Sequence, residues 1–256
     1  MLDALSHLAL EVKHLDRARS FYVDRLGLPV VHESDTEVGV RVGGSTLRLR
    51  RPTAVPRGGL HVHYAFTTPA PAYDDWLAQL ADLAPAEHQF GSYRSLYVDD
   101  PDDHCVEIGG IGDGAASGTT VDGEAEESST ETDAEATARS ASGDAPPLTG
   151  IFEVVLEVAD LAAAAARYTA LGFEVVDRGD DRRRVRLRGP FDLELWEPHL
   201  GLADARGGVH VDLGLRTDDP AAAVAALGDD VVSQESVDGG VRVQERDGHW
   251  LTFLAE

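Results

Sequence analysis

The chain repeats a pattern of strand, helix and further strands, and this repeat limits its fold more than any other feature. Residues Ser6–Val12 alternate in the way of a half-buried strand, and a helical pattern follows over Leu15–Leu26 and ends at Gly27. The second half of the chain begins in the same way, with a strand pattern over Phe152–Val158 and an Ala-rich helix that ends at Gly172. The repeat therefore predicts several copies of one strand–helix–strands unit.

A second pair of matching segments shows that each half holds two such units. Residues Gly58–His63 match Gly207–Asp212, and a helical pattern follows each of them, over Tyr73–Leu83 and Ala221–Leu227. We therefore expect an α+β fold of paired βαβββ modules that form cupped mixed β-sheets, in two such domains.

A change of composition separates the two halves. Residues 112–148 consist almost wholly of Gly, Ser, Thr, Ala and acidic residues, with few large apolar side chains. Such a segment cannot bury enough surface to offset the entropy of ordering it, so it predicts an acidic disordered linker. Residues 1–111 are then the N-terminal domain, with two modules and a metal site, and residues 149–256 are a C-terminal domain with a degenerate site.

The charge of the chain indicates adaptation to salt. Lys+Arg number 22 against 46 Asp+Glu, which gives a formal net charge of −24, and Lys13 is the only lysine. In molar salt the Debye length is only about 3 Å, so the mutual repulsion of these carboxylates is screened. The composition therefore favours a halophilic protein.

This interpretation predicts a salt-dependent stability. As KCl is lowered from molar concentration to about 0.1 M, where screening extends to roughly 10 Å, the melting temperature should fall. NaCl should act as KCl does, because the effect is one of screening. A melting temperature that does not change across this range would contradict the halophilic interpretation.

Composition also excludes several classes of function. The one compact basic cluster, Arg182–Arg188, alternates like the exposed face of a strand, so we expect no nucleic-acid partner. No stretch has the length and hydropathy of a membrane span, and the N-terminus lacks the features of a signal peptide, so we expect a cytoplasmic protein. Cys105 is the only cysteine, which excludes an intrachain disulfide. A small-molecule substrate is the expected partner, and self-association into a homo-oligomer is compatible with the sequence.

Three residues at matching module positions predict a metal site. Strand alternation places Leu8 and Leu10 on the core face of the first strand and His7 on the other face. By the same alternation, His63 and Glu107 lie on the faces of their strands that point away from the core. If the two modules of the N-terminal half pair into one curved sheet, these three side chains converge. His61 shares the face of His63 and is the alternative ligand.

Two imidazoles and one carboxylate leave adjacent coordination positions open on a divalent metal. This set suits Fe(II) first, and Mn(II), Zn(II) or Ni(II) are the alternatives. Substrate and O₂ can bind side by side at such a centre.

Two motifs resemble a known superfamily. The segment His7–Val12 with Phe21–Leu28 resembles the opening of vicinal oxygen chelate proteins, which include glyoxalases, bleomycin-resistance proteins and extradiol dioxygenases. The segment Ser95–Glu107 resembles the closing motif of its catechol 2,3-dioxygenase-like branch. The resemblance implies that His7, His63 and Glu107 bind the metal.

The same resemblance implies roles for two further residues. Tyr97 would hydrogen-bond the substrate or bound oxygen, and His88 would act as an acid–base group. The strand before the second ligand carries Arg48 and Arg50, where the branch usually has a histidine. Arginine stays protonated and cannot shuttle a proton, which is a departure from the branch.

We therefore expect a metal-dependent oxidoreductase, an extradiol ring-cleaving dioxygenase acting on a catechol-like substrate. The alternatives are a glyoxalase-like lyase or isomerase, in which the metal is a Lewis acid, and a non-catalytic binding protein of the bleomycin-resistance type.

Overall fold

The structure is a computed structural model that describes residues 2–52, 62–112, 145–179, 183–197 and 211–255. The alternative ligand His61 and most of the expected linker, residues 113–144, lie outside this described part. The described end of that segment contacts the fold, because the Thr68 hydroxyl donates a hydrogen bond to the carbonyl of Pro147 at 2.8 Å.

Four modules follow one another along the chain, each with one strand, one helix and three further strands, as the repeat predicts. Module 1 comprises β1 (Leu2–Glu11), α1 (Leu15–Arg19), β2 (Val30–Glu33), β3 (Glu37–Val42) and β4 (Ser45–Arg50). Module 2 comprises β5 (His63–Pro69), α2 (Tyr73–Gln79), β6 (Ala86–Phe90), β7 (Tyr93–Asp99) and β8 (Cys105–Ile111). Module 3 comprises β9 (Gly150–Glu157), α3 (Leu161–Ala170), β10 (Glu174–Arg178), β11 (Arg184–Arg188) and β12 (Asp192–Trp196). Module 4 comprises β13 (Asp212–Thr217), α4 (Pro220–Leu227), β14 (Val231–Val237), β15 (Gly240–Glu245) and β16 (Trp250–Leu254).

The first predicted helix is divided in two. After α1 the chain forms a π-helical stretch, Ser20–Arg25, that buries Phe21 and Tyr22. Gly27 then ends the helix with φ 69°, a left-handed conformation that glycine adopts without steric cost.

The modules form two eight-stranded mixed sheets, and this confirms the expected α+β class. The first sheet has the order β14-β15-β16-β13-β1-β4-β3-β2 and is called sheet A; the second has the order β10-β11-β12-β9-β5-β8-β7-β6 and is called sheet B. Modules join through antiparallel pairs of their first strands, β1 with β13 and β5 with β9. Both sheets therefore contain one module from each half of the chain.

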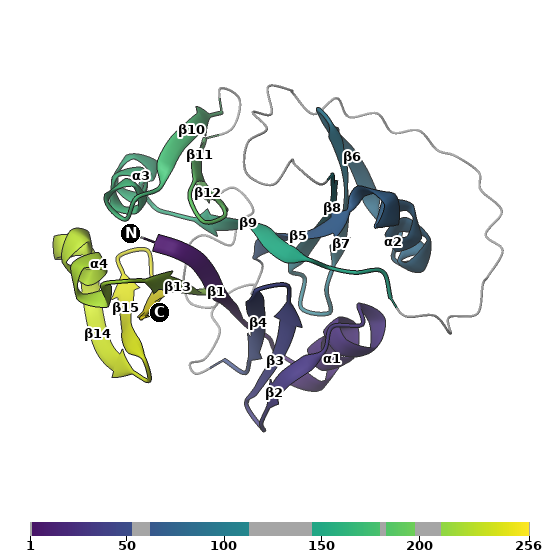
Figure 1. Cartoon of the computed structure of the whole chain (residues 1–256), viewed down its shortest axis with the longest axis horizontal. Coiled ribbons are helices and arrows are strands. Elements are labelled where there is room, and N and C mark those ends of the chain that lie inside the picture. The colour runs from purple at the N-terminus through teal and green to yellow at the C-terminus, as the bar shows by residue number, and fades with distance from the viewer. Residues whose placement is uncertain (1, 53–61, 113–144, 180–182, 198–210, 256) are drawn as a thin grey trace.

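This pairing differs from the expectation that modules 1 and 2 share a sheet. Within a half, the modules pack through helices and turns instead, and α1 and α2 lie together at one end of the molecule while α3 and α4 lie at the other (Figure 1). In the N-terminal half the buried Tyr22 hydroxyl donates to Asp100 Oδ2 at 2.7 Å. In the C-terminal half the buried Arg167 guanidinium forms an ion pair with Glu245.

Two histidines at equivalent turns also join the modules of each half. His104 accepts a hydrogen bond from the Val62 amide through Nδ1 at 3.0 Å, and its Nε2 lies 3.0 Å from the carbonyl of Glu11. His249 Nε2 lies 2.9 Å from the carbonyl of Glu157. Both side chains are buried, and these contacts give the two histidines a structural role. No helix in the described part of the chain is long and apolar enough to span a membrane.

Candidate functional site

Each module contributes two equivalent side chains to the face of a sheet that lies opposite the hydrophobic core, here called the cup face. One lies on the first strand of the module. The other lies on the last strand, two residues after the residue that pairs with the first-strand residue. In module order, the first-strand residues are His7, His63, Glu153 and Asp212, and the last-strand residues are Arg48, Glu107, Glu194 and Thr252.

Because the sheets combine modules of different halves, these eight residues separate into two sets of different chemistry. The cup face of sheet B, called cup B, receives His63, Glu107, Glu153 and Glu194. The cup face of sheet A, called cup A, receives His7, Arg48, Asp212 and Thr252. Cup B is thus rich in metal-binding oxygen atoms.

Three residues of cup B form a cluster that could hold a metal ion. One ligand atom from each of His63, Glu107 and Glu153 lies within 4.8 Å of the other two. His63 Nε2 is 3.2 Å from Glu107 Oε2. Glu107 and Glu153 are both buried, and burial raises the pKa of Glu153 well above its usual value, with Glu194 adding to the rise. One imidazole and two buried carboxylates form a donor set that fits a divalent metal.

The hydroxyl of Ser95 orients the carboxylate of Glu107 through the oxygen that does not face His63. It donates a hydrogen bond of 2.5 Å to Glu107 Oε1, which leaves Oε2 facing His63. Groups that orient metal ligands in this way contribute to metal affinity.

We expect Ser95→Ala to weaken Mn(II) binding by about ten- to a hundredfold, because Glu107 loses its orienting partner. The matched control is Ser45→Ala, since the buried Ser45 hydroxyl donates a 2.6 Å bond to the Leu5 carbonyl in sheet A. Calorimetric titration with Mn(II) measures both variants. Equal affinities of the Ser95 and Ser45 variants would contradict the orienting role.

The residues proposed for catalysis lie beside this cluster. The Tyr97 ring is 5.7 Å from the His63 ring and 5.2 Å from the His88 ring, measured between centroids. Burial raises the pKa of Tyr97, and the neighbouring Glu107 carboxylate raises it further, so the phenol keeps its proton at neutral pH. His88 lies on β6, opposite Ser95 in register. The structure thus brings His63, Glu107, Tyr97 and His88 together.

Arginines surround the acidic side of cup B. Arg186 forms ion pairs with Glu153 and, at 3.2 Å, with Asp192. Glu194 accepts hydrogen bonds of 2.8 Å from Arg184 and from the Trp196 indole. Glu194 is therefore held by its neighbours beside the cluster of His63, Glu107 and Glu153, although it occupies the position equivalent to Glu107.

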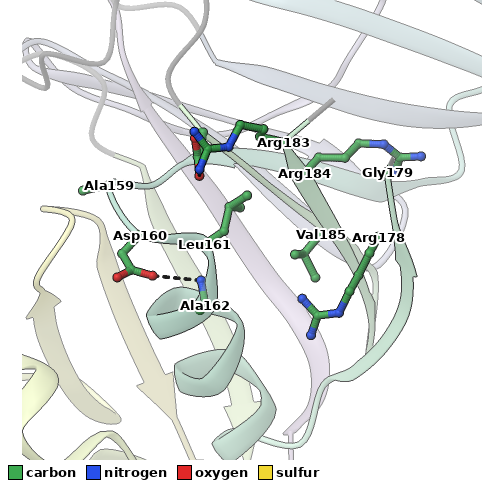
Figure 2. Close-up of a pocket in the computed structure, with 10 residues that line it drawn as sticks. Ala159, Asp160, Leu161, Ala162, Arg178, Gly179, Arg183, Arg184 and Val185 are labelled. Atoms are coloured by element: carbon green, nitrogen blue, oxygen red, sulfur yellow. Dashed lines mark hydrogen bonds and ion pairs between the residues drawn. The ribbon is translucent and has the colours of Figure 1, made fainter. Parts of the chain in front are cut away.

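A cavity of about 510 Å³ lies away from this chemistry (Figure 2). It opens between the first turn of α3 and the ends of β10 and β11, and Arg178, Arg183 and Glu197 are among its lining residues. None of His63, Glu107 and Glu153 lines it. We therefore place the candidate active site in cup B, where the reactive groups are, rather than in this cavity.

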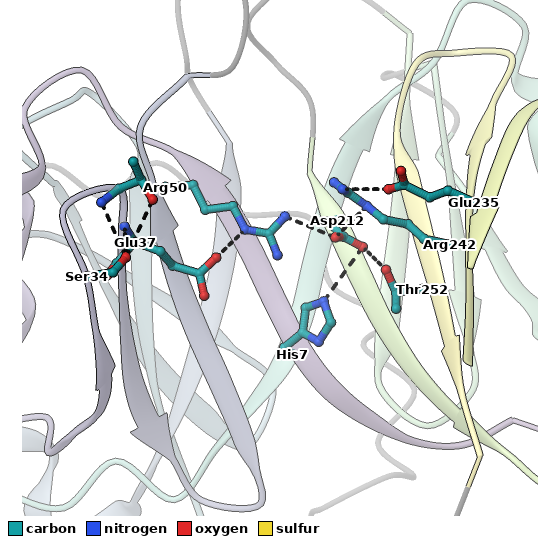
Figure 3. Close-up of polar contacts among 9 residues, drawn as sticks. His7, Ser34, Glu37, Arg50, Asp212, Glu235, Arg242 and Thr252 are labelled. Carbon is teal, nitrogen blue, oxygen red and sulfur yellow. Dashed lines mark hydrogen bonds and ion pairs between the residues drawn. The ribbon is translucent and has the colours of Figure 1, made fainter. Parts of the chain in front are cut away.

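Cup A has a network of ion pairs around a single carboxylate (Figure 3). Asp212 accepts a hydrogen bond from Thr252 at 2.7 Å and pairs with Arg50 at 3.1 Å and Arg242 at 3.0 Å. Although burial acts to raise it, the neighbouring His7, Arg242 and Arg50 hold the pKa of Asp212 below its usual range. The cation that such a carboxylate requires is thus supplied by arginine.

His7 belongs to cup A, and the structure does not bring it to His63 and Glu107. Its Nε2 is 3.7 Å from Asp212 Oδ1, and burial lowers the pKa of its imidazole. The ring occupies the space above Gly214, where an added Cβ would lie 2.1 Å from His7 Nδ1. The expected set of His7, His63 and Glu107 is therefore not assembled, because modules 1 and 2 belong to different sheets.

Cys105 follows the chemistry expected from its neighbours. Burial raises the pKa of its thiol to about 12, and Asp99 and Glu107 contribute to the rise. The thiol is therefore protonated at neutral pH and is not a nucleophile.

The fold and cup B define a class of protein: paired βαβββ modules with a cluster of candidate metal ligands on the cup face of a sheet. One protein-family model matches part of the chain. Residues 4–108 match the Glyoxalase/Bleomycin resistance protein/Dioxygenase superfamily. The matched segment contains both His63 and Glu107.

Individual relatives match a similar share of the chain. Metallothiol transferase FosB of Staphylococcus haemolyticus (strain JCSC1435) is 27% identical over 116 residues, which cover 42% of this chain and 84% of that protein. The same enzyme of Staphylococcus epidermidis is 26% identical over 116 residues, with the same coverage.

Two solved structures resemble nearly the whole chain. A "putative dioxygenase" from Bacillus subtilis subsp. subtilis str. 168 matches with a TM-score of 0.68 and 16% identity, over 99% of this chain and 85% of that one. Glyoxalase I from Zea mays matches with a TM-score of 0.61 and 14% identity, over 98% and 92%. At these identities the likeness concerns the fold, including the presence of both halves.

Sequence analysis missed Glu153 as a member of the metal-binding cluster. The repeat does identify it as the counterpart of His7. What the repeat leaves open is which modules share a sheet, and this decides whether His7 or Glu153 faces His63 and Glu107.

Proposed function

We propose that this chain is a divalent-metal-dependent lyase or isomerase that binds its substrate through two adjacent oxygen atoms in cup B. The observation that carries the proposal is the cluster of His63, Glu107 and Glu153, which draws on both halves of the chain. A lyase of the glyoxalase type needs more protein ligands than the N-terminal half alone provides. Module 3 supplies a third candidate ligand, the carboxylate of Glu153, and a further acid, Glu194, at the position equivalent to Glu107.

The donor set favours a metal that accepts oxygen ligands. One imidazole and two carboxylates suit Mn(II) or Fe(II), while Zn(II) and Ni(II) are the alternatives. Bound there, the metal would supply Lewis acidity toward the two substrate oxygens.

The surrounding residues then have distinct tasks. The protonated Tyr97 hydroxyl can donate a hydrogen bond to a substrate oxygen. Glu194, whose carboxylate is held by Arg184 and Trp196, is the group that we assign to accept a proton from the substrate.

Extradiol ring cleavage is the second candidate, and one observation favours it. His88 contacts Tyr97, which in turn contacts His63, so an acid–base histidine is within reach of the site. We rank this function second because cup B offers one imidazole where the expected iron site has two. If ring cleavage is the reaction, His88→Gln should lower kcat by about 10²–10⁴-fold with unchanged metal content.

One series of assays separates these functions. Anaerobically purified protein is analysed for metal, loaded with Mn(II) or Fe(II), and tested in high salt. We expect stoichiometric metal and turnover of methylglyoxal–thiol adducts; the names of the relatives, metallothiol transferase and glyoxalase, support thiol-containing substrates. O₂ uptake with catechols would instead favour the dioxygenase. Metal binding without either activity would support a binding protein of the bleomycin-resistance type.

A further inference from the structure

Arg186 lies at the centre of the charged side of cup B. On β11 the neighbouring Val185 and Leu187 are buried in the core, so alternation places Arg186 on the cup face. Its side chain is 15% exposed and forms an ion pair with Glu153, a member of the metal-binding cluster. The guanidinium therefore competes with a metal for the same carboxylate.

If Glu153 serves as a metal ligand, N–H donors of Arg186 that were paired with it become available to another acceptor. The other carboxylate neighbours of Arg186 are Asp192, at 3.2 Å, and Glu194, whose Oε1 is 3.8 Å from Nε, and this buried Nε makes no hydrogen bond. Arginine carries five N–H donors in a fixed planar arrangement, which suits a carboxylate or another oxyanion. Arg186 can then bind an anionic group that enters the cup.

The opposite wall of cup B is aromatic. Phe152 lies edge-on to Tyr93, with ring centroids 6.3 Å apart, and Tyr93 stacks on Phe90 at 5.6 Å. Arg186 approaches the Tyr93 hydroxyl, where its charge opposes the rise in the pKa of Tyr93 that burial and Glu107 cause. A planar apolar group on this wall would therefore have its edge next to the guanidinium.

We propose that Arg186 is a specificity residue that selects a substrate with an anionic group beside its chelating oxygens and an aromatic or other planar apolar body. In the metal-free protein Arg186 holds Glu153; once metal has drawn Glu153 away, Arg186 binds the substrate anion. This inference rests on the proposed metal site, and it adds the substrate class and the order of binding: metal first, anion second.

The test uses the full chain, freed of metal by a chelator, and two probes that differ by one negative charge. Calorimetry measures Mn(II) binding, and then the binding of 2,3-dihydroxybenzoate and of catechol to the Mn(II)-loaded protein. We expect the anionic probe to bind the unmodified protein about ten- to a hundredfold more tightly than catechol, the range of a charge-assisted hydrogen bond. Arg186→Met should lose this preference and bind Mn(II) as tightly as before or more tightly, because the competitor for Glu153 is gone.

Arg188→Met is the matched control. Arg188 lies two residues along β11 and pairs with Asp192 at 3.5 Å, so its replacement should leave the Mn(II) affinity and the probe preference intact. Retained preference in Arg186→Met, or weaker Mn(II) binding in that variant, would overturn the inference. Absence of preference in the Mn(II)-loaded, unmodified protein would overturn it as well. Failure of that protein to bind Mn(II) at all would refute the proposed metal site itself, and the two failures are therefore distinguishable.

Discussion

Replacing His63 by Ala should abolish stoichiometric metal binding, with a loss of affinity of more than about a hundredfold, whereas His7→Ala should leave it intact within a few-fold. The reason is the module pairing. His63 faces Glu107 and Glu153 in sheet B, whereas His7 faces Asp212 in sheet A. Elemental analysis and calorimetric titration measure both variants, and a melting curve shows that each is folded.

The His7→Ala variant is the control for His63→Ala, because both remove a buried or half-buried imidazole but only His63 belongs to the proposed metal site. In His7→Ala the carboxylate of Asp212 keeps Arg50, Arg242 and Thr252 as partners, so the rest of cup A remains neutralised. Loss of metal from both variants would restore the assignment of His7 as a ligand.

Arg167→Leu should lower the free energy of unfolding by about 3–5 kcal/mol, because it leaves a buried carboxylate without its cation. Arg167 is 4% exposed, and Glu245 has no exposed surface. The guanidinium also pairs with Asp247 at 2.7 Å and Asp230 at 3.4 Å, and these contacts join α3 to turns of module 4. Denaturant unfolding in high salt measures the loss.

Two comparisons isolate the buried charge as the cause. Arg94→Leu removes an exposed arginine that pairs with Asp74 and Glu87, and it should cost no more than about 1 kcal/mol. Glu245→Gln in the Arg167→Leu background removes the uncompensated charge and should recover part of the stability. Similar losses for Arg167→Leu and Arg94→Leu would show that the buried ion pair does not stabilise the protein.

The sequence predicts the modules because their signals are local. Alternation identifies the strand faces, so the cup-face positions of His63 and Glu107 follow from the residues next to them. The helix patterns end at Gly27 and Gly172, where the structure also ends its helices. The equivalence of Glu153 with His7, and of Asp212 with His63, also follows from the repeat.

The sequence does not indicate which other strand pairs with the first strand of each module. Strand β1 could pair with β5 of its own half or with β13 of the other, since all three carry apolar core faces. The choice determines the site: pairing within the half would assemble His7 with His63, while the observed pairing assembles Glu153 with His63. The ion pair of Asp212 with Arg50 in cup A joins the two halves of the chain, and it could be predicted only once the strand pairing is known.

The central claim is that the metal site combines both halves of the chain. A crystal of the Mn(II)-loaded protein, measured at a wavelength where manganese scatters anomalously, tests it most directly. The claim predicts a single strong anomalous peak per chain, bounded by His63 Nε2 and the carboxylates of Glu107 and Glu153. A peak beside His7 and Asp212, or a peak at His63 with Glu153 still paired to Arg186, would contradict it.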